Sequence, residues 1–114
     1  MSNMTLQDLL NDLFGVKTSY RISPIVNNAD IATQKFLNIN PNRVSFVIFN
    51  LSANNVYISP SNLVSATNGF WVAPNGGSIS FQWDKDFELV SQEWFFMSNV
   101  DNSNVFILEN YIVN

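Results

Sequence analysis

The sequence predicts an all-β domain, an antiparallel β-sandwich or small barrel, with a short amphipathic helix at its N-terminal end. Short apolar segments are separated by turn signals roughly every 8 to 12 residues, which is typical of such folds. The clearest segment, residues 78–83, alternates strictly between polar and apolar side chains. We expect residues 1–15 to hold this helix, as a possible anchor, and residues 16–114 to form a single β-sandwich domain.

Residues 5–14 carry the helical pattern. Five large apolar side chains recur at the spacing of one helix face: Leu6, Leu9, Leu10, Leu13 and Phe14. Thr5 suits the N-cap, Asp8 lies in the first turn where the helix dipole favours a negative charge, and Gly15 suits the C-terminal stop. A helix of about ten residues is marginal in water, so this helix has to dock. Its own β domain and another protein are equally good partners.

The segment that follows the helix is less regular. Short strands are expected at residues 18–22 and 35–39. Pro24 ends the first of them, because proline cannot donate to a strand ladder. Residues 27–30 and 40–42 are rich in turn-forming side chains, so we expect turns there.

From residue 43 onward the pattern is β throughout. Residues 43–50 are apolar on both faces, as in a strand buried on two sides or covered by a partner on one of them. In residues 78–83, Ile79, Phe81 and Trp83 share one face, so we expect Trp83 in the core. The other strands are expected at residues 56–59, 70–72, 87–90, 93–98 and 104–113.

The composition argues against most enzymatic mechanisms. The chain has 114 residues, no histidine and no cysteine, with 12% charged and 46% hydrophobic residues. Without histidine there is no ordinary general base near neutral pH. Without cysteine and histidine, the usual zinc site and the thiol nucleophile are also missing. We therefore expect no catalytic residue, no cofactor and no metal, and interpret the chain as part of an assembly.

Acidic side chains offer two alternatives to this interpretation. Asp84, Asp86 and Glu88 alternate across a corner and are oxygen ligands of the kind that calcium takes. A solvated turn explains them better, since no glycine-rich loop supports them. Glu93 with Asp84 or Glu88 would be a carboxylate pair of the glycosidase type. Any β domain with nine acids offers such pairs, so this second alternative is weak as well.

Charge and hydropathy limit the kinds of partner and the location that we expect for this chain. The net charge is −4 and the five cations are scattered, unlike the basic patch of a nucleic-acid binder. No apolar run approaches the roughly 20 residues that cross a bilayer. The first residues include two acids before the first lysine, unlike a secretory signal. We expect a protein that stays in the cell that makes it, or leaves as part of a particle.

Consecutive aromatic residues mark two strands. Neighbouring side chains in a strand point to opposite faces, so one member of each group lies outside the core of its own domain. Burial at a subunit interface is the favoured explanation. The alternative is a sugar-stacking surface formed by Tyr57, Trp71, Trp83 and Trp94. Together with the five apolar residues of the helix, the interface candidates are Phe70, Trp71, Trp94, Phe95 and Phe96.

One further pattern spans about half of the chain. Asn40-Pro41-Asn42-Arg43 leads into an apolar strand, and a short aromatic strand follows in residues 54–58. An Asn-Gly turn at 68–69, a Pro-X-Gly-Gly turn at 74–77 and Glu93-Trp94 complete it. In these elements the chain resembles small β-rich virion proteins of tailed bacteriophages. The resemblance implies an accessory structural role on a head, neck, tail or fibre, and it transfers no catalytic residue.

These observations lead to one expected function and its rivals. We expect a non-enzymatic virion structural protein that is made in the host cytoplasm, forms a homo-oligomer and docks on other virion proteins. Closed cyclic association is the usual form; a trimer, which we prefer, suits a fibre or spike, and a higher ring suits a neck or vertex. The alternative is a carbohydrate-binding module for host attachment. A small enzyme that uses carboxylates alone is the third hypothesis.

Overall fold

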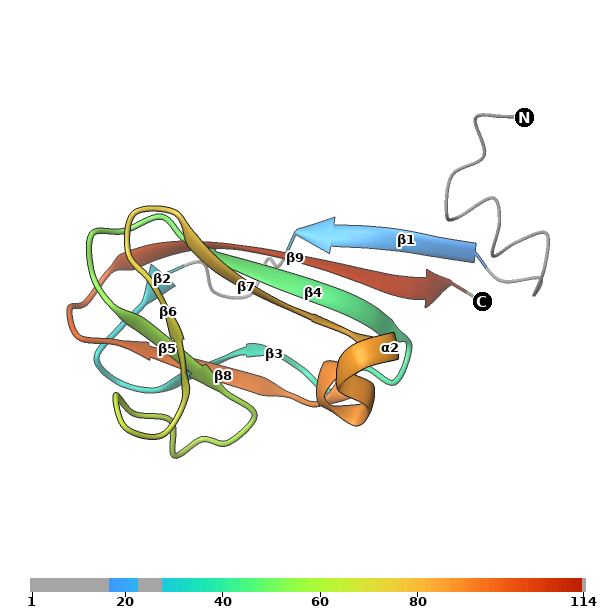
Figure 1. The fold of residues 1–114 in the computed structure, drawn as a ribbon, viewed down its shortest axis with the longest axis horizontal. Coiled ribbons are helices and arrows are strands. Elements are labelled where there is room, and N and C mark those ends of the chain that lie inside the picture. The colour runs from blue at the N-terminus through green and yellow to red at the C-terminus, as the bar shows by residue number, and fades with distance from the viewer. Residues whose placement is uncertain (1–16, 23–27, 114) are drawn as a thin grey trace.

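Two antiparallel sheets build the domain (Figure 1). The computed structural model describes residues 17–22 and 28–113, and nine strands lie within these ranges. The expectation of a mainly antiparallel β fold is therefore confirmed. The expected helix at residues 5–14 lies outside the described residues.

The larger sheet has five strands and is centred on the two longest ones. These are β4 (Arg43–Asn50) and β9 (Ser103–Val113), which pair along most of the length of β4. β1 (Lys17–Ile22) pairs with the outer side of β9, and β7 (Gly77–Gln82) pairs with β4. The order is thus β1-β9-β4-β7, with β2 (Asn28–Ala29) beside the start of β9.

The smaller sheet has four strands in the order β3-β8-β5-β6. Its strands are β3 (Gln34–Leu37), β8 (Trp94–Ser98), β5 (Val56–Ser59) and β6 (Phe70–Val72). In the view of Figure 1 this sheet lies below the five-stranded one. Every pairing within it is antiparallel, as the turn signals of the sequence predict.

A tight turn carries the chain from β6 in one sheet to β7 in the other. Asn75 and Gly76 both have positive φ, 60° and 95°, which asparagine and glycine adopt most easily. Their backbone N–H groups donate to the carbonyls of Ser52 and Asn50, each at 2.7 Å. At Gly77 a Cβ atom would lie only 2.3 Å from the Ala73 carbonyl oxygen. The expected turn at residues 74–77 is therefore present, and its last position has no room for a side chain.

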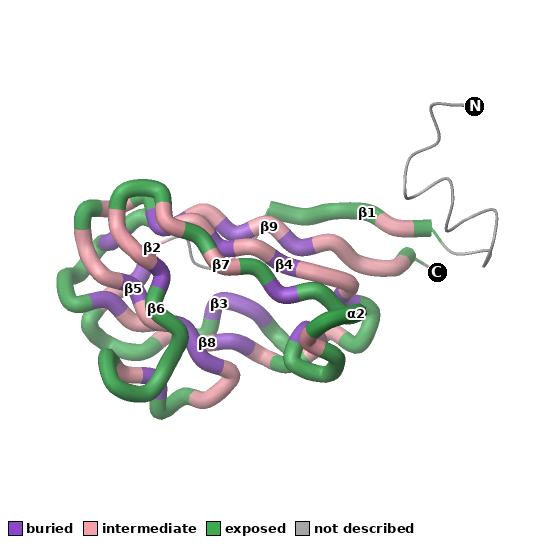
Figure 2. The backbone as a smooth tube through the Cα atoms, in the orientation of Figure 1, coloured by how far each residue is buried: buried purple, intermediate pink, exposed green. Residues whose placement is uncertain are grey.

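The core fills the space between the inner faces of the two sheets. Figure 2 shows buried positions alternating along the strands on both sides of this space. Trp94 of the smaller sheet lies at its centre, with ring centroids 5.1 Å from Phe46 and 4.7 Å from Phe81 of the larger sheet. Phe36 and Phe96 stack at 4.7 Å within the smaller sheet. This aromatic packing joins the sheets into one sandwich-like unit.

Residues 83–91 differ from the sequence expectation. The strand alternation ends at Gln82, and the chain enters α2 (Trp83–Asp86) and then the 3₁₀ helix η1 (Phe87–Ser91). Trp83 is consequently 59% exposed instead of lying in the core. The expected strand at residues 87–90 is likewise wrong, because this segment coils across one end of the sandwich. Of its side chains, Val90 is the one that is buried.

Candidate interaction surfaces

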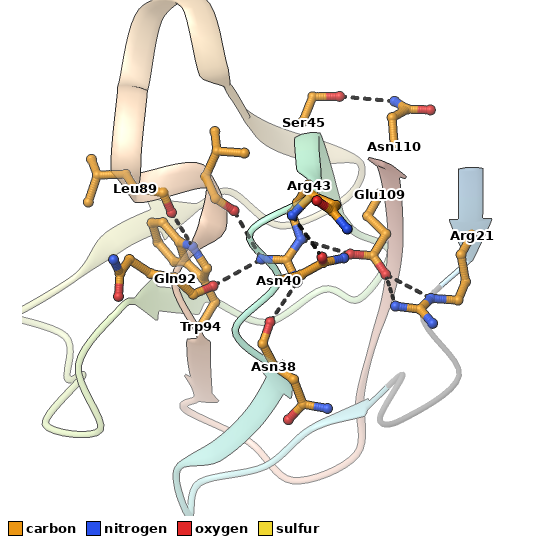
Figure 3. A network of polar contacts seen from close by, with 12 residues as sticks. Arg21, Asn38, Asn40, Arg43, Ser45, Leu89, Gln92, Trp94, Glu109 and Asn110 are labelled. Atoms are coloured by element: carbon orange, nitrogen blue, oxygen red, sulfur yellow. Dashed lines mark hydrogen bonds and ion pairs between the residues drawn. The ribbon is translucent and has the colours of Figure 1, made fainter. Parts of the chain in front are cut away.

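A buried ion pair fixes the end of the sandwich where the helical segment lies (Figure 3). Glu109 follows Val105 and Ile107 on the inward face of β9, so its carboxylate enters the interior. Arg43 meets it from β4, with Nε donating to Oε2 at 2.7 Å, and both side chains are only 1% exposed. A buried carboxylate needs such a partner, because desolvation of an unpaired charge is expensive.

Arg43 also holds the segments that the strand pattern does not explain. Its Nη1 donates to the carbonyl oxygens of Val90 and Gln92, each at 2.9 Å. Its Nη2 donates to the carbonyl oxygen of Asn38 at 2.7 Å. The Trp94 indole adds a bond to the Leu89 carbonyl at 2.9 Å. These donors satisfy carbonyls at the end of a short helix, which explains why residues 87–91 coil instead of pairing.

Arg21 completes the cluster from the edge strand β1. Its Nε donates to Oε1 of Glu109 at 2.7 Å, and its Nη2 forms a second bond to the same oxygen. The Arg21 side chain is 54% exposed, so water screens this contact far more than the Arg43 pair. Both carboxylate oxygens of Glu109 are thus bound to guanidinium groups. We interpret the cluster as a structural clamp on β1, β4, β9 and η1.

Asn50 organises the opposite end of β4. Its side chain is fully buried, and its amide nitrogen donates to the carbonyls of Asn54 and Val72 at 2.6 and 3.0 Å. Its amide oxygen accepts from the backbone N–H and the hydroxyl of Ser52 at 3.0 and 2.6 Å. Four bonds from one side chain therefore hold the loop after β4 against β6.

The outer face of the five-stranded sheet is apolar. Val47 and Phe49 alternate with the buried Phe46 and Ile48 and therefore point away from the core. They pair with Leu108 and Phe106 of β9, and the rings of Phe49 and Phe106 lie 6.3 Å apart. The outward residues of β1 extend this row. We call the surface the β4–β9 face; it consists of Tyr20, Ile22, Val47, Phe49, Phe106 and Leu108.

Polar but uncharged residues border the β4–β9 face. Ser78 and Ser80 of β7 lie opposite Phe49 and Val47. On β1, Ile22 pairs with Leu108, while Tyr20 pairs with Asn110. Tyr20 and Ile22 are 66% and 53% exposed. Among the described residues, no charged side chain interrupts this surface at the paired outward positions.

The outer face of the four-stranded sheet has a different character. Trp71 and Tyr57 are cross-strand neighbours, and Tyr57 also pairs with Met97. The Trp71 indole N–H donates to Oδ1 of Asn55 at 3.1 Å, while Oδ1 of Asn99 accepts the backbone N–H of Asn55 at 2.9 Å. We call these five residues the Trp71 surface. It combines aromatic rings with amides, where the β4–β9 face is almost purely apolar.

The sequence-predicted aromatic candidates separate into outward and inward residues. Trp71 points outward and is 59% exposed, and Phe95 is half-buried on the same face, with the Lys35 ammonium 5.9 Å from its ring centroid. Trp94 and Phe96 are completely buried in the core, so neither presents a surface to a partner. Each group is split between the two faces of its strand, as alternation predicts, but alternation does not determine which member lies inside.

Phe70 and the helix residues complete that set of candidates. Phe70 turns toward the core, with its ring 5.3 Å from Phe81 and 6.1 Å from Trp94, yet it keeps 41% of its surface exposed at the sheet edge. The remaining candidates lie outside the described residues: Leu6, Leu9, Leu10, Leu13 and Phe14.

The acidic corner has a local structural role. The Asp86 carboxylate accepts the backbone N–H of Gln82 at 2.8 Å, which stabilises the turn into α2. Glu93 forms an ion pair with Lys35 at 3.1 Å on the smaller sheet. Asp86, Glu88 and neighbouring residues line an open surface hollow. In residues 17–22 and 28–113, no group of three or more acidic side chains is placed to hold a metal ion.

Sequence reasoning missed the Arg43–Glu109 pair, although a signal for it exists. Glu109 occupies an inward position of a strand that otherwise alternates apolar residues inward. A charge at such a position requires an opposite charge from a facing or adjacent strand. Arg43, at the start of the longest apolar strand before β9, is a natural partner.

Comparisons with protein-family models, curated proteins and solved structures found no match. No helix in the described part of the chain is long and apolar enough to span a membrane. The β4–β9 face and the Trp71 surface, on the outer faces of the two sheets, are the features that bear most directly on function.

Proposed function

We propose that this chain is a non-enzymatic virion structural protein, an accessory component of a head, neck, tail or fibre. In this proposal it associates with copies of itself through the β4–β9 face and docks on other virion proteins. The observation that carries the proposal is this face: a row of large apolar side chains on the outer side of a sheet whose inner side already has a complete core.

Burial of this face would stabilise association. Fully burying a side chain such as Val, Leu, Ile or Phe contributes about 1.5–3 kcal/mol, and partly covered ones contribute proportionally less. Tyr20 and Ile22 are the most exposed members, and both lie at the β1 edge of the row. Soluble monomers rarely leave a contiguous apolar patch open unless it has a partner. The low charge content, 12% of residues, does little to keep such a patch soluble.

The size of the face indicates how much of the interface it supplies. The three strands of the face, spaced about 4.8 Å apart, and the eight residues of β4 at about 3.4 Å each give at most roughly 400 Å² of flat area. Specific interfaces at the small end bury about 600 Å² per partner. The face therefore supplies at most about two thirds of a small interface. We propose that the leucine stripe of residues 5–14 adds to it by docking on a neighbouring subunit or on another virion component.

Closed cyclic symmetry would cover every copy of the face and prevent open-ended growth. Our preferred arrangement is a trimer, because a threefold assembly suits a fibre or a spike. The bacteriophage assignment itself is supported by the resemblance in residues 40–96, from the Asn-Pro-Asn-Arg start to Glu93-Trp94.

Particle composition tests the proposal. Purified particles of the phage that encodes the chain should contain it at a fixed ratio to the major capsid protein. A variant with Leu9→Asp and Leu13→Asp should keep the circular dichroism spectrum of the β domain and lose incorporation. Absence of the wild-type chain from purified particles would contradict the virion role, and normal incorporation of the double variant would remove the anchoring role of the helix.

A further inference from the structure

We infer that the Trp71 surface, formed by Asn55, Tyr57, Trp71, Met97 and Asn99, binds a neutral carbohydrate. This site lies on the outer face of the four-stranded sheet, and the β4–β9 face lies on the outer face of the other sheet. The inference is therefore independent of the proposed assembly role. It gives a definite site and ligand class to the carbohydrate alternative that the sequence leaves open.

The Trp71 ring is held in place before any ligand arrives. Its indole N–H donates to Oδ1 of Asn55 at 3.1 Å, while the side chain remains 59% exposed. The Asn55 backbone is itself fixed, because its carbonyl accepts from the Ser98 hydroxyl at 3.0 Å. A ring that is already oriented loses less conformational freedom on binding. Its electron-rich face is suited to the C–H groups of a pyranose ring, which carry partial positive charge.

Amide donors lie beside this ring. Oδ1 of Asn55 is occupied by the indole N–H, and Oδ1 of Asn99 by the Asn55 backbone N–H. Because both oxygens face N–H donors, the orientation of each amide is settled. Each NH₂ group then keeps its donors for a ligand, since neither has a hydrogen-bond acceptor within the described part of the chain. Sugar hydroxyls and ring oxygens accept such bonds.

The surroundings favour a neutral ligand. The Trp71 surface has no acidic or basic side chain among its five residues. The charged residues of the same sheet face, Lys35 and Glu93, neutralise each other at 3.1 Å. Lys35 lies on β3, three strands away from β6, at about 14 Å by strand spacing. With a net charge of −4 on the whole chain, an anionic sugar would be mildly repelled.

Trp83 shows that exposure alone does not make such a site. It is also 59% exposed, but it begins α2 and lies in a hollow with Pro41, Val44 and Ile112. Asn42 is the one amide side chain in that hollow. Within the described residues, no hydrogen bond holds the Trp83 indole in place. Trp83 is therefore a matched control for Trp71: the same residue type, the same exposure, and none of the orienting contacts.

Affinity electrophoresis of the full chain in native gels tests the inference. Gels would contain dextran, galactomannan, laminarin or xylan as neutral probes, and polygalacturonate as an anionic probe. We expect retardation by at least one neutral polysaccharide and none by polygalacturonate. Trp71→Ala should abolish the retardation, and Trp83→Ala should leave it unchanged. Asn55→Asp keeps the acceptor for the indole and removes the NH₂ donor, so it should weaken binding about tenfold.

Several outcomes would overturn the inference. These are the absence of retardation by any neutral probe, equal loss in Trp71→Ala and Trp83→Ala, or retardation by polygalacturonate alone. If Trp71→Ala lowers the mass of the protein in solution, a second copy covers this surface and the carbohydrate assignment fails. Trp71→Phe keeps an aromatic ring and serves as a control for misfolding of Trp71→Ala. It should retain measurable retardation with an unchanged circular dichroism spectrum. None of these results bears on particle incorporation.

Discussion

Replacement of Arg43 by methionine should be the most destabilising single change in the buried ion cluster. Methionine fills much of the same space but removes the cation that Glu109 meets at 2.7 Å with both side chains 1% exposed. Breaking a buried pair from one side costs about 3–5 kcal/mol. The carbonyls of Asn38, Val90 and Gln92 lose their donors as well. We therefore expect a loss of about 5 kcal/mol in the free energy of unfolding.

Three companion variants set the scale of the loss in the free energy of unfolding. Glu109→Gln keeps a hydrogen-bonding side chain and leaves Arg43 its three carbonyl acceptors, so we expect a loss of about 3 kcal/mol. Arg21→Met removes a contact whose cation is 54% exposed, so the loss should stay below about 1 kcal/mol. The double variant Arg43→Met/Glu109→Met also removes the buried anion, which would otherwise keep only the half-exposed Arg21 as its partner. It should recover part of the loss, although the carbonyls remain without donors.

Urea denaturation, followed through the fluorescence of the tryptophans, measures these differences by linear extrapolation. All variants must be compared at one protein concentration, because association stabilises the folded chain. The predicted order of destabilisation is Arg43→Met, then Glu109→Gln, then Arg21→Met. A loss below about 1 kcal/mol for Arg43→Met, or an equal loss for Arg21→Met, would refute the assignment of the buried pair as the structural clamp.

Four further variants probe three separate parts of the fold. Gly77→Ala should destabilise the domain by about 3 kcal/mol or more in thermal melts, because its Cβ would lie 2.3 Å from the Ala73 carbonyl oxygen. Gly76→Ala introduces only the strain of a φ of 95° and should cost about 1 kcal/mol. Asn50→Ala removes the four hydrogen bonds of a fully buried side chain and should cost about 3 kcal/mol in urea denaturation. A loss under about 1 kcal/mol would contradict the role assigned to this residue. Trp83→Ala should change the melting temperature by no more than a few degrees, since the side chain is 59% exposed, and a large drop would mean that Trp83 belongs to the core after all.

Local sequence patterns predict most of the strands of this domain. Alternation locates β7 and the inward position of Phe81, and the apolar run at residues 43–50 coincides with β4. The Pro-Asn-Gly-Gly sequence gives the turn before β7, because its central residues need positive φ. These signals are local: each depends on neighbouring residues in the chain and on the twofold period of a strand.

Long-range contacts explain where prediction from sequence fails. The segment after Gln82 contains large apolar residues at strand spacing. It nevertheless coils, because Arg43 and Trp94, which belong to other elements, donate hydrogen bonds to its carbonyl oxygens. The choice of Trp94 and Phe96 over Phe95 as core residues depends on pairing with β3 and β5. Likewise, the contact of Trp71 with Asn55 joins positions 16 residues apart. The alternation of polar and apolar residues along one strand carries no information about these long-range contacts.

The mass of the protein in solution tests the central proposal, association through the β4–β9 face, most directly. Sedimentation velocity from low to high micromolar concentration should give a closed oligomer of the 12.9 kDa chain, with a trimer preferred. Leu108→Lys places a charge between Val47 and Ile22 and should reduce the mass to that of one copy. Met97→Lys, half-buried on the outer face of the other sheet, is the control and should keep the oligomer. A wild-type chain that sediments as a monomer at high micromolar concentration would contradict the proposal.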